Sequence, residues 1–191
     1  VCGTDIHLQQ GRLPIPLPVV LGHEAVGRVA ELGEGFTTDA LGQPLRVGDP
    51  VSWASNISCE ECFRCVQDEE PSLCGDHTAY GINQWSAHWP PLSGGWSEQI
   101  YLQPGSTIVR LPEGVEPEEV IALGCAGSTT AHALWQIARP EEGETVVVQG
   151  SGLVGIAAAM MATIAGAGRV IMLGGPTSRL RTAQSLGIGD V

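Results

Sequence analysis

The chain has 191 residues, of which 43% are hydrophobic, and a formal charge of −12 from 9 Lys and Arg against 21 Asp and Glu. Because phosphate backbones and acidic membranes are also negative, this balance argues against nucleic acid or a membrane surface as a partner. The sequence contains neither an apolar run of about 18 residues nor a secretory leader, so we expect a cytoplasmic protein. It opens without methionine and stops where a further strand would begin, so we expect both ends to be cut.

Short strands dominate the first part of the predicted fold. Residues 18–32 and 46–53 mix valine and leucine with glycine in approximate alternation, and residues 96–102 and 106–112 alternate as well. The stretch 75–95 is rich in tryptophan, histidine, proline and glycine, which predicts a loop whose tryptophans pack or line a substrate pocket. These patterns together indicate a small, all-β domain.

The pattern changes in the second part of the chain. Residues 117–138 carry apolar side chains at helical spacing. A strand at 145–149, an alanine-rich helix at 153–167, a strand at 169–173 and a helix at 178–187 are then expected. This βαβα order predicts a parallel sheet with helices on its faces.

Four of the six cysteines cluster in the segment "SCEECFRCVQDEEPSLC". Disulfides fit this cluster poorly, because a reducing cytosol disfavours them, and a redox pair would need only two thiols. Four thiolates at such spacing can instead surround a tetrahedral zinc ion and leave no position open for substrate. The sequence therefore predicts a structural zinc site, with these ligands: Cys59, Cys62, Cys65 and Cys74.

A glycine-rich turn follows the strand at 145–149. Gly150, Gly152 and Gly155 form the pattern GxGxxG, and Leu153 and Val154 open the next helix. In a βαβ unit this pattern is typical of dinucleotide binding, because the glycines let the backbone approach a pyrophosphate at the helix N-terminus. The alternative is a glycine turn in an unrelated α/β protein.

The residue that would select the cofactor lies at the end of the second strand. A carboxylate there would bind the adenosine ribose of NAD, but the sequence has Gly174. Without that carboxylate the 2′-phosphate of NADP is not repelled, and Arg179 could bind it or stack on the adenine. The sequence leaves NAD and NADP open, with a slight preference for NADP.

Three further segments, "CGTDIH" at 2–7, "GHE" at 22–24 and "LGCAGSTTAHAL" at 123–134, occur in order with the cysteine cluster and the glycine turn. With these five motifs the chain resembles the zinc-containing medium-chain alcohol dehydrogenases. The resemblance implies an α/β protein in two parts. These are a GroES-like, mostly-β catalytic domain over 1–126, lacking its N-terminus, and the first part of a Rossmann NAD(P)-binding domain over 127–191.

The resemblance also implies a second, catalytic zinc site. Cys2, His23 and Cys125 would be its ligands, with a fourth position open to water or substrate. Glu24 would lie next to the metal, where it could act as a transient ligand, and Asp5 would orient His23.

Three more residues receive roles from the family. Thr4 matches the hydroxyl that hydrogen-bonds the substrate alcohol, His7 matches the outer end of a proton relay, and Thr129 matches a residue that packs on the nicotinamide. Such a relay carries off the alcohol proton while hydride leaves for the cofactor.

The implied function is hydride transfer between an alcohol or polyol and NAD or NADP, with two zinc ions per intact chain. The expected partners are a small-molecule substrate and further copies of the chain, in a dimer or tetramer. Two alternatives stay open: a non-catalytic zinc-binding module, and a dehydrogenase of the same scaffold for a specialised polyol or amino-alcohol. The family spaces the third and fourth cluster cysteines by seven residues and this chain by eight, which leaves the geometry of that loop open.

Overall fold

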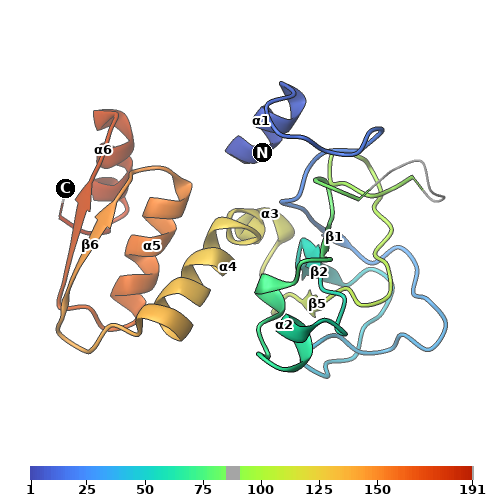
Figure 1. Ribbon diagram of the computed structural model, residues 1–191. Coiled ribbons are helices and arrows are strands. Elements are labelled where there is room, and N and C mark those ends of the chain that lie inside the picture. Colours follow the sequence, from blue (N-terminus) through green and yellow to red (C-terminus); the bar gives the residue numbers. More distant parts are fainter. Residues whose placement is uncertain (85–90, 191) are drawn as a thin grey trace. The chain divides into compact units, whose positions relative to one another are not determined.

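The computed structural model describes residues 1–84 and 91–190 and separates into two compact units, Val1–Gly124 and Cys125–Val191. Figure 1 colours the first unit from blue to yellow and the second from yellow to red. The first unit ends at Gly124, whereas the sequence placed the boundary after residue 126. The loop tryptophans Trp85 and Trp89, expected to pack or to line a substrate pocket, fall outside the described residues.

A three-stranded antiparallel sheet forms the centre of the first unit. Its middle strand alternates in the way that predicts a half-buried strand, with Val51 and Trp53 buried. These two side chains form a core with Leu45 and Tyr80. The strands, in spatial order, are β1 (Val26–Arg28), β2 (Pro50–Trp53) and β5 (Ile108–Arg110).

The cysteine segment lies between two short paired strands. β3 (Asn56–Ile57) pairs antiparallel with β4 (Thr78–Ala79), which brings the two ends of the segment together. The segment itself contains the single helical turns α2 (Phe63–Val66) and η1 (Pro71–Leu73). The sequence predicted a loop over 75–95, so β4 was missed.

Helices in the first unit correct the all-β expectation. α1 (Gly3–Gln9) begins after Cys2, whose backbone N–H donates to the Asp5 carboxylate at 2.8 Å. An acidic side chain in the first turn stabilises a helix N-terminus in this way. α3 (Pro117–Val120) starts with proline, which is favoured at the first helical position, and runs into the turn η2 (Ile121–Leu123).

The strand predicted over 96–102 is wrong. Ser97 donates to the carbonyls of Gly94 and Gln99, and such side-chain bonds compete with a strand ladder. The Trp96 N–H bonds to Leu21 instead of to a neighbouring strand. The alternation nevertheless identified the inward side, because Ile100 and Leu102 pack on the core.

The second unit confirms the predicted βαβα order. β6 (Thr145–Gln149) and β7 (Arg169–Leu173) pair in parallel, and α5 (Leu153–Ile164) connects them. α6 (Thr177–Ser185) follows β7. The core combines alanines of the helices, β-branched and long side chains of the strands, and one isoleucine from the turn after α6: Val148, Ala159, Ala162, Val170, Met172, Ala183 and Ile188.

The long helical stretch expected over 117–138 is divided between the units. α4 (Ala126–Ala131) continues directly into the π-helical turns η3 (His132–Ala138). Arg139 then adopts a left-handed conformation with φ of 46°, and the proline after it cannot continue a helix. Among the described residues, no helix combines the length and apolarity that crossing a membrane requires.

Candidate metal centres and nucleotide turn

The four clustered cysteines meet at one point of the first unit, and their Sγ atoms all lie within 4.8 Å of one another. The Cys62 and Cys65 sulfurs are 3.5 Å apart, those of Cys59 and Cys74 are 3.5 Å apart, and those of Cys59 and Cys65 are 4.0 Å apart. A zinc ion with four bonds of about 2.3 Å to sulfur requires sulfur–sulfur edges of about 3.8 Å. The cysteines are free, and their geometry fits a closed zinc site.

Local turns assemble this cluster. Cys62 precedes α2, and its backbone N–H points at the Cys59 sulfur at 3.3 Å. The backbone N–H of Cys59 in turn points at the Cys74 sulfur at 3.4 Å. Glu69 takes up a left-handed conformation with φ of 54°, and the turn η1 then delivers Cys74. The eight-residue spacing is therefore accommodated by this tight loop.

The pKa values of Cys62 and Cys65 in the cluster are shifted in opposite directions. Backbone and side-chain hydrogen bonds from Cys65 lower the pKa of Cys62 to about 7, whereas desolvation and the hydrogen bond with Cys62 raise the pKa of Cys65 to about 12. Adjacent thiolates repel one another, so without a cation only part of the set can ionise. A divalent cation at the centre stabilises all four thiolates, which again fits zinc.

A second set of candidate ligands lies at the start of the first unit. Cys2 is half-buried and His23 is buried, and the Cys2 Sγ and a His23 ring nitrogen lie within 4.8 Å of each other. Asp5, which is fully buried, connects them. One of its carboxylate oxygens accepts the Cys2 backbone N–H at 2.8 Å, and the other lies 3.0 Å from His23 Nδ1.

This carboxylate determines which ring nitrogen of His23 can bind a metal. A carboxylate accepts hydrogen bonds, so Nδ1 carries the proton and Nε2 keeps the lone pair. One thiolate and one imidazole are ligands that suit zinc. The buried Asp5 contact thus fixes the orientation of the His23 ring and leaves Nε2 able to bind a metal.

Two of the residues expected around this centre, Thr4 and His7, lie on α1. The Thr4 hydroxyl lies 3.8 Å from the Cys2 sulfur and is half-buried, whereas His7 is exposed. Their three-residue spacing places both on one face of the helix. Glu24 follows His23 directly and keeps only 6% of its side chain exposed.

Two expected site residues belong to the second unit. Cys125 is half-buried and stands at the N-terminal end of α4, where its carbonyl accepts the N–H of Thr129 at 3.0 Å. Thr129 is exposed on the same helix. The roles of Cys125 and Thr129 remain predictions.

The glycine turn has the backbone that its sequence pattern predicts. Gly150 has φ of 123°, a conformation that side chains rarely adopt, and Gly152 caps α5. A Cβ atom on Gly155 would overlap the Gly150 carbonyl, so only glycine allows the helix to start this close to the strand. Leu153 and Val154 are exposed at the first turn of α5.

Sequence reasoning missed one residue of this turn. Ser151 is buried and its hydroxyl donates to the Gly175 carbonyl at 2.9 Å, which ties the glycine turn to the segment after β7. Gly174 lies against Ser151, and a Cβ on Gly174 would come within 2.8 Å of the Ser151 N atom. Arg179 is exposed, and its guanidinium would lie 3.8 Å from a Cβ on Gly152. The only sequence signal for Ser151 is its place between two glycines.

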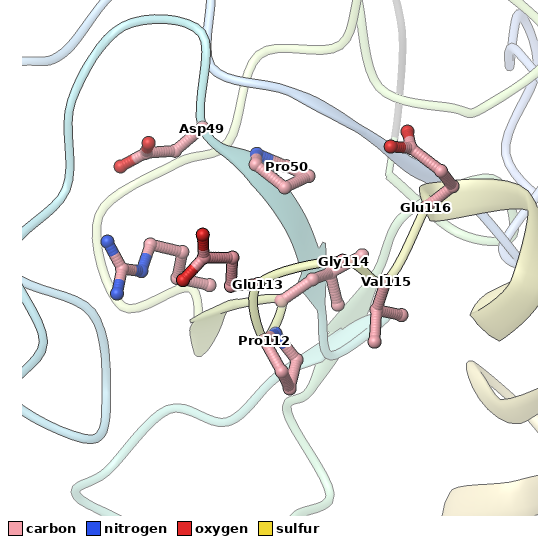
Figure 2. A pocket seen from close by; sticks show the side chains of 9 residues that line it. Asp49, Pro50, Pro112, Glu113, Gly114, Val115 and Glu116 are labelled. Carbon is pink, nitrogen blue, oxygen red and sulfur yellow. The ribbon is translucent and has the colours of Figure 1, made fainter.

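A surface pocket of about 300 Å³ lies elsewhere in the first unit, at the ends of β2 and β5. Figure 2 shows the carboxylates of Asp49, Glu113 and Glu116 around it. Asp49 accepts the backbone N–H of Arg46 at 2.8 Å, and Glu116 pairs with Arg28 at 2.6 Å. These contacts stabilise local loops. The residues that line the pocket include no cysteine or histidine, so the pocket lacks the ligands found at the two candidate metal centres.

Comparisons with known proteins agree with the motifs. Residues 1–113 match the alcohol dehydrogenase GroES-like domain. The chain belongs to the zinc-containing medium-chain alcohol dehydrogenases. Its fold is accordingly a GroES-like unit followed by the start of a Rossmann domain. This family uses zinc and NAD or NADP.

Individual relatives place the chain within the family. It is 38% identical over 189 residues to 5-exo-hydroxycamphor dehydrogenase of Pseudomonas putida, covering 98% of this chain and 50% of that protein. It is 32% identical to L-threonine 3-dehydrogenase of Rhizobium rhizogenes, covering 100% and 51%. A crystal structure of an alcohol dehydrogenase from Thermotoga maritima superposes with a TM-score of 0.92 at 37% identity, covering 98% and 52%. The chain therefore spans about half the length of these medium-chain dehydrogenases.

Proposed function

We propose that the protein containing this chain is a zinc-dependent oxidoreductase that interconverts an alcohol and an aldehyde or ketone with NAD or NADP. The observation that carries the proposal is the buried Asp5 carboxylate, which contacts both the Cys2 backbone and His23 Nδ1. Burial of an ionised carboxylate costs free energy unless the group is paired and hydrogen-bonded, and both Asp5 oxygens have such partners. The contact with His23 Nδ1 suits a role of His23 as a metal ligand, and the family membership supports that role.

Cys2, His23 and Cys125 are proposed to hold the catalytic zinc, with Glu24 beside it. When bound, the zinc polarises the substrate oxygen as a Lewis acid and the nicotinamide ring takes up the hydride. The four-cysteine cluster is proposed to hold the second zinc. That cluster has no open position, so its contribution is to the stability of its loop.

The chain's own side chains provide the route for the proton. Thr4 is half-buried beside Cys2 and is proposed to receive the hydrogen bond of the substrate hydroxyl. His7 is exposed one helical turn further along α1 and is proposed to pass the proton to solvent. The two residues therefore connect the interior of the unit with water along one helix face.

The glycine turn between β6 and α5 is proposed to bind the pyrophosphate of the cofactor. Backbone N–H groups and the helix N-terminus provide the attraction for the phosphates at Gly150, Gly152 and Gly155. Leu153 and Val154 would line the same turn, with Thr129 packing on the nicotinamide. With glycine at 174 and Arg179 over the turn, NADP is expected to be accepted as well as NAD.

The enzyme is proposed to act on a small molecule in the cytoplasm, as a dimer or tetramer of identical chains. Zinc binding by four cysteines requires reduced thiols, which favours a reducing compartment. The relatives named for hydroxycamphor and threonine suggest a cyclic or functionalised alcohol as substrate.

The test is a substrate panel on the full-length protein, with zinc analysis of the same preparation. Because hydroxycamphor and threonine each carry a secondary hydroxyl, the panel pairs secondary with primary alcohols, against NAD and NADP. We expect two zinc ions per chain and cofactor reduction with at least one alcohol. A single zinc with no cofactor binding would instead identify a non-catalytic zinc-binding module.

A further inference from the structure

Four glycines surround the backbone next to His23. Gly22 precedes this histidine, and Gly81, Gly94 and Gly95 approach it from two other segments of the first unit. A Cβ on Gly81 would overlap the Gly22 carbonyl, and a Cβ on Gly94 would overlap the Val20 carbonyl. We call Gly22, Gly81, Gly94 and Gly95 the glycine clasp.

Backbone hydrogen bonds join the segments of the clasp. The Gly95 N–H donates to the Gly22 carbonyl at 2.7 Å, and the Trp96 N–H donates to the Leu21 carbonyl at 2.9 Å. The Gly81 N–H donates to the Ser93 carbonyl at 2.7 Å, which joins the two outer segments to each other. Three stretches of backbone therefore meet at the residue before His23.

Gly22 itself cannot be replaced at this crossing. Its φ is 101°, and a Cβ there would come within 2.5 Å of the Trp96 ring and 2.8 Å of the Trp96 N atom. Gly94 and Gly95, by contrast, do not have a φ in the left-handed region. The lack of space around them is what calls for glycine, so alanine at either position displaces the His23 segment.

From these contacts we propose that Gly81, Gly94 and Gly95 are positioning residues for the Cys2–His23 metal centre. The inference rests on the proposed function, because it assigns the clasp a role in holding a ligand of the catalytic zinc. Asp5 fixes the His23 ring through Nδ1, and the clasp fixes the backbone that carries the ring. Ligand sites tolerate displacements of only about 0.5 Å, so both constraints are needed for tight binding.

The first test is Gly94→Ala in the full-length protein, with Gly33→Ala as the matched control. Gly33 is exposed, lies in the same unit, and has open space around its Cα. We expect Gly94→Ala to weaken metal binding at the Cys2–His23 centre by about tenfold or more, as losses of supporting contacts commonly do. The cluster metal and the Gly33→Ala protein should be unchanged.

The readouts are metal content, chelator competition and the visible spectrum of the cobalt-substituted protein. Cobalt bands report ligand geometry, so a displaced His23 shifts them even when cobalt remains bound. A change in folding stability alone leaves those bands in place.

A second pair of variants covers the case in which Gly94→Ala fails to fold. A Cβ on Gly95 would lie 2.6 Å from the Ala25 Cβ, and its next approach is 3.2 Å from the Gly22 carbonyl oxygen. Gly95→Ala should therefore weaken the centre, and adding Ala25→Gly should restore most of the affinity and the cobalt spectrum. Restoration supports the proposal whatever Gly94→Ala does.

Three results would overturn the inference. One is unchanged affinity and cobalt spectra in both Gly94→Ala and Gly95→Ala. Another is a Gly95→Ala defect that Ala25→Gly does not relieve. The third is wild-type protein without metal at Cys2 and His23, which would defeat the proposed function together with the inference, whereas the first two defeat the inference alone.

Discussion

The two candidate metal centres of the first unit are built in opposite ways. All four ligands of the cluster come from residues 59–74, and local turns with backbone N–H groups pointing at sulfur assemble them. Cys2 and His23 come from separate segments and meet through a buried carboxylate on α1 and the close packing around Gly22. One centre is a property of a loop, and the other is a property of the tertiary structure.

We expect the two centres to differ in role, the cluster contributing to stability and the Cys2–His23 centre to catalysis. The cluster offers four ligands and no open position, so its metal can only support structure. Cys2 and His23 are the proposed ligands of a metal with an open position, and the proposed proton route runs over Thr4 and His7 on one face of α1. We therefore expect each centre to be lost independently of the other.

Among the substitutions, removal of His23 should have the largest effect. His23→Ala in the full-length enzyme should lower kcat/KM by about 1000-fold, because a Lewis acid contributes several kcal/mol and each 1.36 kcal/mol is tenfold in rate. Zinc analysis should still find the cluster metal. His132→Ala is the control, and activity retained in His23→Ala would refute the assigned ligand role.

Removing a cluster ligand should have the complementary effect. Cys62→Ala should release the cluster zinc and lower Tm by roughly 5–10 °C, because structural zinc binding contributes directly to folding free energy. At a temperature where the variant is folded, kcat should fall by less than about tenfold. Calorimetry and steady-state kinetics on one preparation measure both quantities, and a loss of activity as large as that of His23→Ala would contradict the division of roles.

The Asp5 contact offers a finer test of how the second centre is held. Asp5→Asn keeps the size of the side chain but replaces one accepting oxygen with a donor, so it cannot serve both Cys2 and His23. We expect metal affinity at this centre to fall by about 10–100-fold. Asp49→Asn, which alters a carboxylate bound to a backbone N–H in a surface loop, is the control. Equal metal affinities at this centre in the two variants would show that Asp5 does not help to hold the metal.

The smallest expected effect concerns the cofactor. Arg179→Ala should raise KM for NADP by about tenfold and change KM for NAD little, since a charge-assisted hydrogen bond to phosphate contributes about 1.5–3 kcal/mol. Arg169, which donates to Asp190 at 2.8 Å at the other end of β7, provides the control variant. Parallel changes for both cofactors would show that Arg179 does not select between them.

Patterns that act over a few residues predicted the structure well. The strands at Val26–Arg28, Pro50–Trp53 and Ile108–Arg110 and the βαβ unit around Gly150 follow from local alternation, helical spacing and turn glycines. The cysteine spacing likewise predicted the cluster, and the four sulfurs meet even though eight residues separate Cys65 from Cys74.

Features that depend on distant segments could not be predicted in this way. The alternation over 96–102 identified inward-facing side chains but not the hydrogen bonds to residues 21 and 92 that keep this segment out of a sheet. Cys2 and His23 were singled out only through the resemblance to a family. The requirement for glycine at 94 and 95 becomes visible only where these residues meet Val20 and Ala25.

The most direct test of two different metal centres is zinc X-ray absorption on the two single-centre variants of the full-length enzyme. His23→Ala retains only the cluster, and we predict four sulfur neighbours at about 2.3 Å. Cys62→Ala retains only the second centre, and we predict two sulfurs, one imidazole nitrogen and one exchangeable light ligand. Four-sulfur coordination in both variants, or no zinc in Cys62→Ala, would contradict the account.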